Sequence, residues 1–406
     1  MTTAPPAAGF PIAQTNAVES ISLFSGIAGF ELGMEPYGLQ PIMFCEIEPA
    51  AQSVLSLWRP DVPLHQDVRL LDQLPRHGRV LVGGFPCTDV SQAGRTEGIF
   101  GQKSGLVRDV FRLLALRKVE TVILENVVNL IHLAGGEGLA YITSQFDALG
   151  YRWAYRVIDT LGFGLPQRRR RIFIVACLEG DPCQILFADD AGPLAAVQTA
   201  EIDLDQHALG FYWTEGNKGL GAALNAIPPL KGGSTIGINS APAILLPDGQ
   251  VGTPDIRDAE RLQGLPADWT LPAEDVKKGS RWMLTGNAVT KDIPAWIASR
   301  MANPGPALGR QGGERRGGQR WPNAAWGKDG RVMSVDISEN PLGRPLTRIQ
   351  DFLAYPLKPL TERQTAGFLA RASASSLRFP PRFIDRLRAH LSEIRAGACS
   401  QMAFAF

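Results

Sequence analysis

One cysteine of the sequence stands in a setting typical of a nucleophile. Cys87 follows Gly83-Gly84-Phe85-Pro86, at the end of the short apolar run Val80–Val82. The two glycines allow a sharp turn after a strand, and Pro86 stiffens the backbone just before the thiol. A thiolate held there can attack an electrophilic carbon. The competing interpretation is a small buried hydrophobe, which is what most free cysteines are.

An acid at a second strand end can serve the same chemistry. Glu125 follows the apolar run Val122–Leu124. If this strand neighbours the one that precedes Cys87, burial would raise the pKa of the carboxyl and let it donate a proton. Without that context, an ion-paired structural acid is an equally ordinary interpretation.

Four arginines in a row form a third candidate group. Residues 168–171 follow Gln167 and precede the apolar run Ile172–Cys177. Alternation along a strand would direct Arg169 and Arg171 to one face, where they can reach a base carbonyl, and the other two to the opposite face, toward phosphate. A solvated basic patch is the alternative.

The first apolar run of the chain ends in small residues that suit a ligand. Gly26 and Gly29 follow Ile21–Phe24 and let a bound group approach the backbone closely. The spacing is not GxGxxG, so a dinucleotide phosphate site is not indicated. Glu46, after the second run, can accept from ribose hydroxyls, and Asp67 can accept from an adenine amino group. A plain turn and two solvated acids are the alternatives.

The elements that must position these residues alternate between strand and helix. Apolar runs at Ile21–Phe24, Ile42–Cys45, Val80–Val82, Val122–Leu124 and Ile172–Cys177 predict buried strands, with helical patterns such as Leu106–Leu116 between them. The alternation predicts an α/β fold, with a parallel-rich sheet covered by helices on both faces. Ligands of such sheets bind beyond the C-terminal ends of the strands.

Changes of pattern along the chain predict the domain organisation. We expect a loose tail over 1–17, a catalytic and cofactor-binding domain over 18–180, a loop- and β-rich region over 181–255, a return to the catalytic domain over 256–302, a Gly/Arg-rich linker over 303–320 and a basic, helical extension over 321–406. Amphipathic helices are predicted at Thr361–Ala372 and Pro381–Ile394.

Composition and charge exclude several classes of protein. Of the 406 residues, 45% are hydrophobic, which supports a sizeable core, yet no run approaches the roughly 18 apolar residues of a membrane helix. Five cysteines without a CxxC pair argue against a disulfide framework and a zinc site, so we expect a cytoplasmic protein without metal. Residues 303–406 carry 16 Lys+Arg and 8 Asp+Glu, a net +8 against −7 for the remainder. This basic portion fits a polyanion or is simply a solvated surface.

Taken in order, these motifs resemble the DNA cytosine-5 methyltransferase family. The resemblance covers about residues 20–180 and 255–300. It rests on the Phe-x-Gly loop at Phe24, Gly-Phe-Pro-Cys at 84–87, Glu-Asn-Val at 125–127, Gln-x-Arg-x-Arg at 167–171, Arg261-Leu262-Gln263-Gly264-Leu265-Pro266 and Gly286-Asn287-Ala288-Val289. It implies a Rossmann-like fold, S-adenosyl-L-methionine as cofactor, double-stranded DNA as partner, and a monomer in a restriction-modification or phage DNA modification system.

The resemblance also assigns roles to individual residues. The implied catalytic set is Cys87 as nucleophile held by Pro86, Glu125 as the acid at the cytosine N3 and N4 side, and Arg169 and Arg171, the latter the better candidate for the cytosine O2. The implied cofactor set is Phe24, Ser25, Gly26, Ile27, Gly29, Glu46, Ile47, Asp67, Val68, Phe85, Leu106, Asn287, Ala288 and Val289. The candidate DNA-binding set is Ser91, Arg168, Arg170, Tyr212, Trp213, Lys218, Lys231, Ser234 and Gln263, with 181–255 as the target-recognition region.

Alternatives remain at this stage. An RNA cytosine-5 methyltransferase would share the fold, and a catalytically silent DNA-binding regulator would lack the complete set of Cys87, Glu125 and Arg171. A nicotinamide-dependent oxidoreductase would require the GxGxxG spacing that Gly26–Gly33 lacks. For the last hundred residues we weigh a basic module that contacts phosphate against a helical brace on the catalytic domain. Phe368, Leu369, Phe379 and Phe383 suit the brace.

Overall fold

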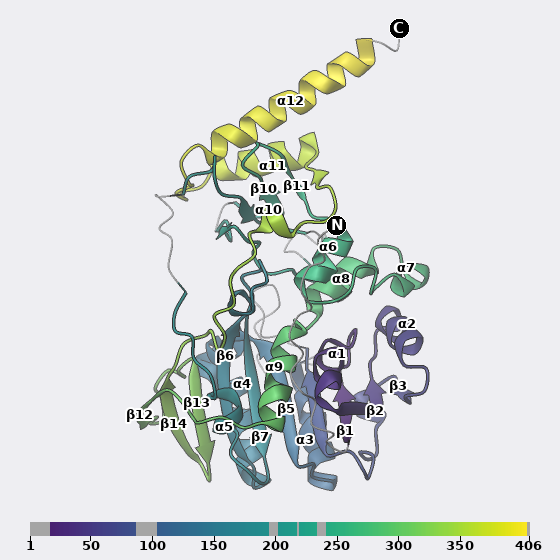
Figure 1. The fold of residues 1–406 in the computed structure, drawn as a ribbon, viewed down its shortest axis with the longest axis vertical. Helices are drawn as coiled ribbons and strands as arrows, with labels where there is room; N and C mark the ends of the chain where they lie inside the picture. The colour runs from purple at the N-terminus through teal and green to yellow at the C-terminus, as the bar shows by residue number, and fades with distance from the viewer. Residues whose placement is uncertain (1–16, 87–103, 195–201, 217–218, 234–240, 404–406) are drawn as a thin grey trace, which may run out of the picture.

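Two β-sheets organise the molecule, one in each of two domains stacked along its long axis (Figure 1). The computed structural model describes residues 17–86, 104–194, 202–216, 219–233 and 241–403. Within these residues no helix is long and apolar enough to cross a membrane. Cys45, Cys177 and Cys183, the cysteines whose side chains are described, are free and buried.

A ten-stranded mixed sheet forms the first domain, in the order β12-β14-β13-β6-β7-β5-β4-β1-β2-β3. Its strands are β1 Val18–Leu23, β2 Leu39–Cys45, β3 Leu64–His65, β4 Val80–Gly84, β5 Thr121–Val127, β6 Arg152–Asp159, β7 Arg170–Cys177, β12 Arg310–Glu314, β13 Ala324–Lys328 and β14 Arg331–Asp336. Neighbours from β3 to β5 are parallel, and those from β5 to β12 are antiparallel. The ends of β1, β2, β4 and β5 therefore meet at one edge.

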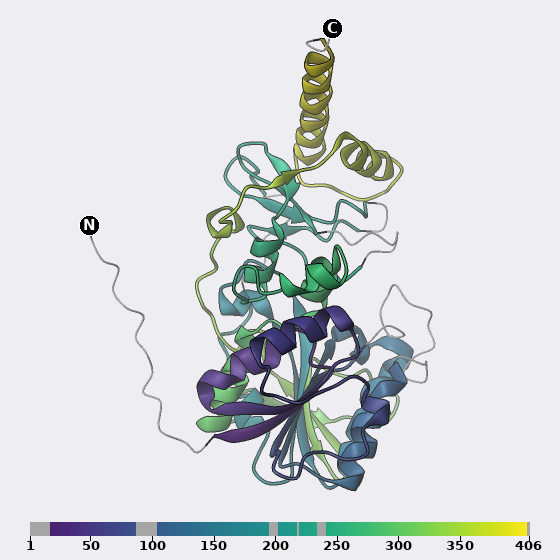
Figure 2. The same cartoon turned by 90° about the vertical axis from the view of Figure 1, so that its right-hand side faces the viewer.

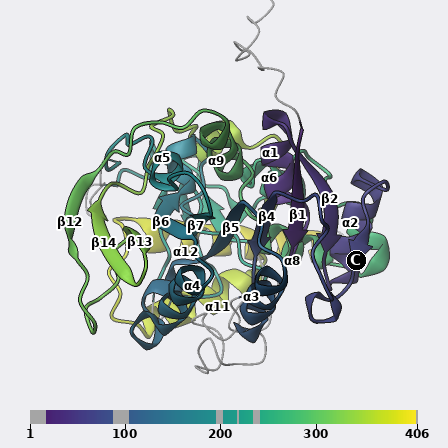
Figure 3. The same ribbon diagram turned by 90° about the horizontal axis from the view of Figure 1, so that it is seen from below.

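Helices cover both faces of this sheet, as predicted (Figure 3). Apolar side chains of α3 Val107–Leu116 and α4 Glu137–Ala148 pack on one face together with Ile21 and Leu23 of β1. On the other face lie α1 Gly29–Met34, α5 Cys183–Leu186 and α9 Asp292–Ala302. The helix α2 Pro49–Trp58 lies beside α7 Pro272–Val276 at the β3 end. The predicted α/β fold is thus confirmed.

The second domain contains a five-stranded antiparallel sheet in the order β15-β11-β10-β8-β9. Its strands are short: β8 Leu209–Phe211, β9 Ala223–Leu224, β10 Ala243–Leu245, β11 Val251–Thr253 and β15 Lys358–Pro359. The helices α6 Ile256–Leu262, α8 Ser280–Asn287 and α10 Ile349–Phe352 lie between the two sheets, and α11 Glu362–Ser373 and α12 Phe383–Ala403 lie at the far end (Figure 2).

Residues 303–406 are not the accessory extension predicted from the sequence. The expected linker contains β12, and β13 pairs with β6, so this segment completes the catalytic sheet. Further along, β15 pairs with β11 of the second domain. Small and apolar residues such as Ala324, Ala325 and Trp326 allow β13 to pack against β6, and both alanines are buried there. The Gly- and Arg-rich composition of 303–320 predicts a linker and gives no sign that a strand pairing follows it.

The predicted C-terminal helices form, but they brace the second domain instead of the catalytic one. The ring of Phe211 on β8 lies 5.3 Å from that of Phe368 on α11 and 5.1 Å from that of Phe383 on α12. All three side chains are buried in one cluster. Several of the basic residues are ion-paired: Arg382 and Arg386 with Asp205, and Arg395 with Glu362. The excess of charge therefore does not by itself indicate a phosphate-binding surface.

Candidate active site

The ends of β4 and β5 bring the predicted acid to the chain segment that leads to the predicted nucleophile. Gly84 and Glu125 are register partners in the parallel pair. A Cβ placed on Gly84 would lie 3.3 Å from Oε2 of Glu125, so the carboxyl lies directly over the end of β4. Gly84 is three residues before Cys87, and Cys87, like Ser91, lies outside the described residues. The described part of the chain thus places the acid beside the residues that lead to the predicted nucleophile.

The acid is buried and paired. Glu125 is 8% exposed, and Nε of Arg171 forms an ion pair with its Oε1 at 3.1 Å. Burial raises the pKa of Glu125, and the charges of Arg171 and Arg169 offset only part of that effect. A carboxyl with a raised pKa can hold a proton near neutral pH and donate it.

Asn126 holds Phe85, two residues before the predicted nucleophile, a role that sequence reasoning did not give it. Its Nδ2 donates to the carbonyl of Phe85 at 3.1 Å, while its Oδ1 accepts from the amide of Val127 at 2.8 Å. The side chain is 2% exposed. An amide beside an acid at a strand end was the available signal. Because Phe85 is held, the direction in which Pro86 leaves the sheet is held as well.

The arginine run divides differently from the prediction. Arg171 faces Glu125, but Arg169 is 2% exposed and donates to three backbone carbonyls, those of Leu230, Gly286 and Ala288. Only its buried Nε has no partner among the described residues. The prediction that Arg169 contacts the substrate base is therefore corrected to a positioning role. β7 begins only at Arg170, so strand alternation does not yet govern residue 169.

The two remaining arginines of the run are exposed, as expected for phosphate contacts. Arg170 is ion-paired with Glu339. The backbone amide of Arg168 donates to the carbonyl of Ile227 at 2.9 Å, and its side chain is exposed to solvent.

The loop after β1 forms an open cradle next to an acid. Gly26 has a φ of 54°, in the left-handed region, and the space beside it is open: a Cβ placed there would meet only the carbonyl oxygen of Phe24, at 4.0 Å. The amide of Gly26 donates to Oε2 of Glu46 at 2.7 Å, and the amide of Glu48 donates to Oε1 at 2.8 Å. Burial raises the pKa of Glu46, although these amides oppose the shift.

Other members of the predicted cofactor set border the same cradle. Ile47 is 61% exposed beside Glu46, and Asp67 follows β3, where Arg69 lowers the pKa of its carboxyl. Gly29 lies against Val289, whose carbonyl oxygen would be 2.5 Å from a Cβ on Gly29. Leu106 is partly buried against the core, and Ser25 Oγ accepts from the amide of Cys45 at 3.1 Å.

Four members of the set are core residues instead. Ile27, Val68, Phe85 and Ala288 are at most 7% exposed and belong to hydrophobic clusters. Their side chains support the cradle, so only their backbones are open to a ligand. Sequence patterns cannot distinguish a side chain that lines a pocket from one that lies directly behind it.

Most of the predicted DNA-contacting residues of the second domain are not open to DNA. Tyr212 and Trp213 are 9% and 6% exposed and donate to the carbonyls of Pro229 and Ala241. Gln263 is fully buried and donates to the carbonyl of Thr285. Lys231 is exposed but bound, with its Nζ 2.8 Å from Glu215 and 3.7 Å from the centre of the Tyr212 ring. Lys218 and Ser234 lie outside the described residues.

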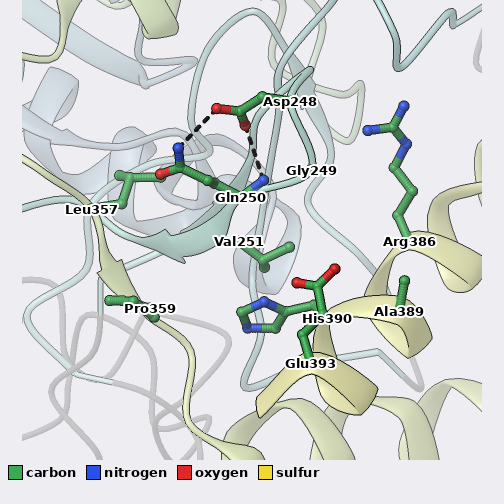
Figure 4. Close-up of a pocket in the computed structure, with 10 residues that line it drawn as sticks. All are labelled: Asp248, Gly249, Gln250, Val251, Leu357, Pro359, Arg386, Ala389, His390 and Glu393. Atoms are coloured by element: carbon green, nitrogen blue, oxygen red, sulfur yellow. Dashed lines mark hydrogen bonds between the residues drawn. The ribbon is translucent and has the colours of Figure 1, made fainter. Parts of the chain in front are cut away.

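A cavity elsewhere is a weaker candidate. A space of about 400 Å³ lies between the β10–β11 turn and α12, lined by Asp248, Gln250, Arg386 and His390 among others (Figure 4). Asp248 accepts a hydrogen bond from Gln250, and Arg386 donates one to the carbonyl of Pro247, so the polar groups of this cavity already have partners within the protein. The acids that line this cavity do not lie beside the residues that lead to Cys87. The ends of β4 and β5 are therefore the candidate active site.

A mixed α/β sheet with an open cradle after β1 and a buried, ion-paired acid at the end of β5 is typical of α/β enzymes that bind a ligand beyond the C-terminal ends of parallel strands. The family model of C-5 cytosine-specific DNA methylases matches residues 18–207. The Type II methyltransferase M2.BsuMI of Bacillus subtilis is 41% identical over 378 residues, which are 90% of this chain and 96% of that protein. The chain belongs to the C-5 cytosine-specific DNA methylase family and is a DNA cytosine-5 methyltransferase.

Two further proteins are similar to this chain. The Type II methyltransferase M.MspI of Moraxella sp. is 25% identical over 302 residues, 70% of each chain. Among solved structures, the Dnmt2 methyltransferase of S. pombe is 15% identical, with 70% of this chain and 97% of that chain covered and a TM-score of 0.48.

Proposed function

We propose that this enzyme transfers a methyl group from S-adenosyl-L-methionine to carbon 5 of a cytosine in one short duplex DNA sequence, through a covalent bond between Cys87 and carbon 6. The observation that carries the proposal is the Glu125 carboxyl over Gly84, paired with Arg171. Relatives named Type II methyltransferases support a role beside a restriction endonuclease.

The residues of the cradle fit the proposed cofactor. Glu46 offers carboxylate oxygens to ribose hydroxyls next to the open space at Gly26, and exposed Ile47 offers an apolar surface to a base. Asp67 can accept from an adenine amino group. When bound, the cofactor supplies an electrophilic methyl group on a sulfonium. Val289 lies beside both Gly29 and Gly84, so the cradle and the acid are adjacent.

The reaction requires a base outside the helix stack, because neither face of carbon 6 is accessible inside it. The thiolate of Cys87 adds to carbon 6 while Glu125 donates its proton at N3, which makes carbon 5 nucleophilic. Carbon 5 would then take the methyl group from the sulfonium, whose bond to that methyl breaks so that a neutral thioether leaves. A base removes the carbon 5 proton, the bond between sulfur and carbon 6 breaks, N3 returns its proton to Glu125, and the ring regains its aromaticity.

Arg171 has two roles in this scheme. Its charge orients the Glu125 carboxyl through the 3.1 Å ion pair, and its remaining donors can reach the cytosine O2. Arg168 and Arg170, on the exposed side, are proposed to contact phosphate. The second domain is the proposed target-recognition region.

Methylation of a plasmid followed by bisulfite sequencing tests the proposal. We expect 5-methylcytosine at one short site, and none with Cys87→Ser. A duplex that contains 5-fluorocytosine should form a stable covalent adduct, because fluorine blocks the elimination step. Methylation that persists in Cys87→Ser would remove the nucleophile assignment.

A further inference from the structure

One residue of the second domain is held at both of its backbone polar atoms by a single sequence motif. The amide of Leu230 donates to Oε1 of Gln167 at 2.9 Å. The carbonyl of the same residue accepts from Nη1 of Arg169 at 2.9 Å. Leu230 is 2% exposed, and its side chain packs in the cluster between the two sheets. Gln167 and Arg169 thus fasten Leu230 to the segment just before β7.

The same guanidinium reaches the turn that borders the cofactor cradle. Nη2 of Arg169 donates to the carbonyl of Ala288 at 2.7 Å and to that of Gly286 at 3.2 Å. Burial lowers the pKa of this guanidinium to about 9, so it stays charged at neutral pH while three carbonyl oxygens surround it. A planar guanidinium can serve acceptors on separate segments at once, whereas an ammonium is a single point of charge.

Direct backbone packing joins the two segments independently of the guanidinium. A Cβ on Gly286 would lie 2.2 Å from the carbonyl carbon of Lys231, and a Cβ on Gly232 would lie 2.2 Å from Oδ1 of Asn287. Gly286 has no room for a larger residue, because the atoms that a Cβ would meet there belong to the backbone. The 230–232 segment and the 286–288 turn are therefore in contact and share one charged side chain.

We infer that Gln167 and Arg169 are positioning residues that couple the proposed recognition region to the cofactor turn. A displacement of Leu230 upon DNA binding must move the guanidinium, and with it the turn that carries Asn287 and Val289. The inference rests on the proposed function for its consequence, which is that cognate DNA strengthens cofactor binding through this contact. Its structural part concerns the free protein alone.

Hydrogen exchange on the cofactor-free, DNA-free protein tests the structural part. Arg169→Lys should accelerate amide exchange several-fold in two peptides together, 226–233 and 284–291. Gln167→Met, which removes the acceptor, should accelerate the first of these more than the second. The matched control is Arg156→Lys, because Arg156 is 1% exposed and also donates to three backbone carbonyls, those of Ser338, Leu186 and Asp189. Arg156 lies on β6, where no proposed site residue depends on it.

Cofactor binding with and without cognate duplex tests the coupling. In the wild type, the duplex should lower the cofactor Kd by about 5- to 150-fold, the range of ordinary site-to-site coupling. In Arg169→Lys this factor should fall toward one, whereas Arg156→Lys should retain it even if its Tm falls equally. Exchange that is unchanged in either peptide of Arg169→Lys, or a coupling factor lost equally in both variants, would overturn the inference. A wild type that fails to methylate DNA would refute the proposed function, while the exchange result would still decide the contact.

Discussion

Arg171 and Glu125 form a 3.1 Å ion pair at the edge of the sheet where the end of β5 lies beside the start of β7. The Glu125 carboxyl lies over Gly84, at the end of β4. Arg171 on β7 therefore orients this acid toward the residues that follow β4. Burial raises the pKa of Glu125, and Arg171 fixes the direction of its carboxyl, so this acid is a better and better-aimed proton donor than an exposed one.

The first prediction concerns the acid itself. Glu125→Gln removes the proton that the carboxyl donates, and we expect the single-turnover rate of methyl transfer to fall by about 10²- to 10⁴-fold. DNA affinity should change little. Glu120→Gln is the matched control, because Glu120 lies just before β5 and pairs with Arg79 on the surface. A comparable loss in the control would contradict the assignment.

The second prediction uses pH. The positive charge of Arg171 opposes the effect of burial on the pKa of Glu125. Arg171→Met removes that charge, so the pKa rises further and the protonated acid persists to higher pH. The alkaline limb of the profile of kcat against pH should therefore shift upward, even though kcat itself falls. A downward shift would show that another group governs this limb.

The third prediction concerns the cradle. Glu46→Gln replaces a carboxylate that accepts from the Gly26 and Glu48 amides, and one of the two amides then faces an NH₂ group. We expect the Kd for S-adenosyl-L-methionine to rise by about 10- to 100-fold, in line with the loss of hydrogen bonds to a charged acceptor. Calorimetric titration without DNA measures this. Glu48→Gln is the control, and an equal loss there would argue for a general charge effect.

The fourth prediction concerns stability. Phe383 is fully buried and its ring packs against Phe211 and Phe368. Phe383→Ala should lower the free energy of unfolding of the second domain by about 3–5 kcal/mol. Thermal denaturation should show a matching fall in Tm. If the variant is as stable as the wild type, α12 is dispensable and the brace interpretation is wrong.

The fifth prediction concerns a buried acid on α1. Glu31 is 2% exposed, and burial raises its pKa to about 7. The folded state prefers the protonated form of Glu31, so this residue does not lower the free energy of unfolding below about pH 4.5. Ionisation of Glu31 lowers the free energy of unfolding as the pH rises from there through 7. Glu31→Gln should therefore stabilise the protein at pH 8 by about 3 kcal/mol, because the shift from 4.5 to about 7 corresponds to about 1.4 kcal/mol per pKa unit. Denaturant unfolding at pH 8 and pH 5 should show this advantage shrinking at the lower pH.

Part of the fold could be read directly from the chain. The predicted strands correspond to β1, β2, β4, β5 and β7, and the helical pattern at Leu106–Leu116 corresponds to α3. The strand β6 was missed because Arg152, Arg156 and Asp159 interrupt its apolar pattern. In the structure Arg156 is buried with its donors satisfied by carbonyls, a compensation that no local pattern reveals.

The sequence predicted the positions of several candidate residues but not their surroundings. Glu125 lies at the end of β5, Glu46 follows β2 and Arg171 lies at the start of β7, as the sequence predicted. Arg169 and Gln263 were assigned to substrate and DNA because they share motifs with such residues, yet both are buried among backbone carbonyls. Tyr212 and Trp213 illustrate the same limit: large aromatic residues suit either a recognition surface or a core, and only tertiary packing decides.

The return of the chain from the catalytic sheet to the second domain has a practical consequence. Because β15 completes the small sheet beside β11, and Phe368 and Phe383 fill its core, that domain is assembled from two stretches separated by more than a hundred residues. A chimera that takes only the first stretch from a relative would combine core residues of two different proteins in one hydrophobic cluster. A transplant of this domain between relatives therefore requires both stretches, with the C-terminal one taken from the same donor as the first.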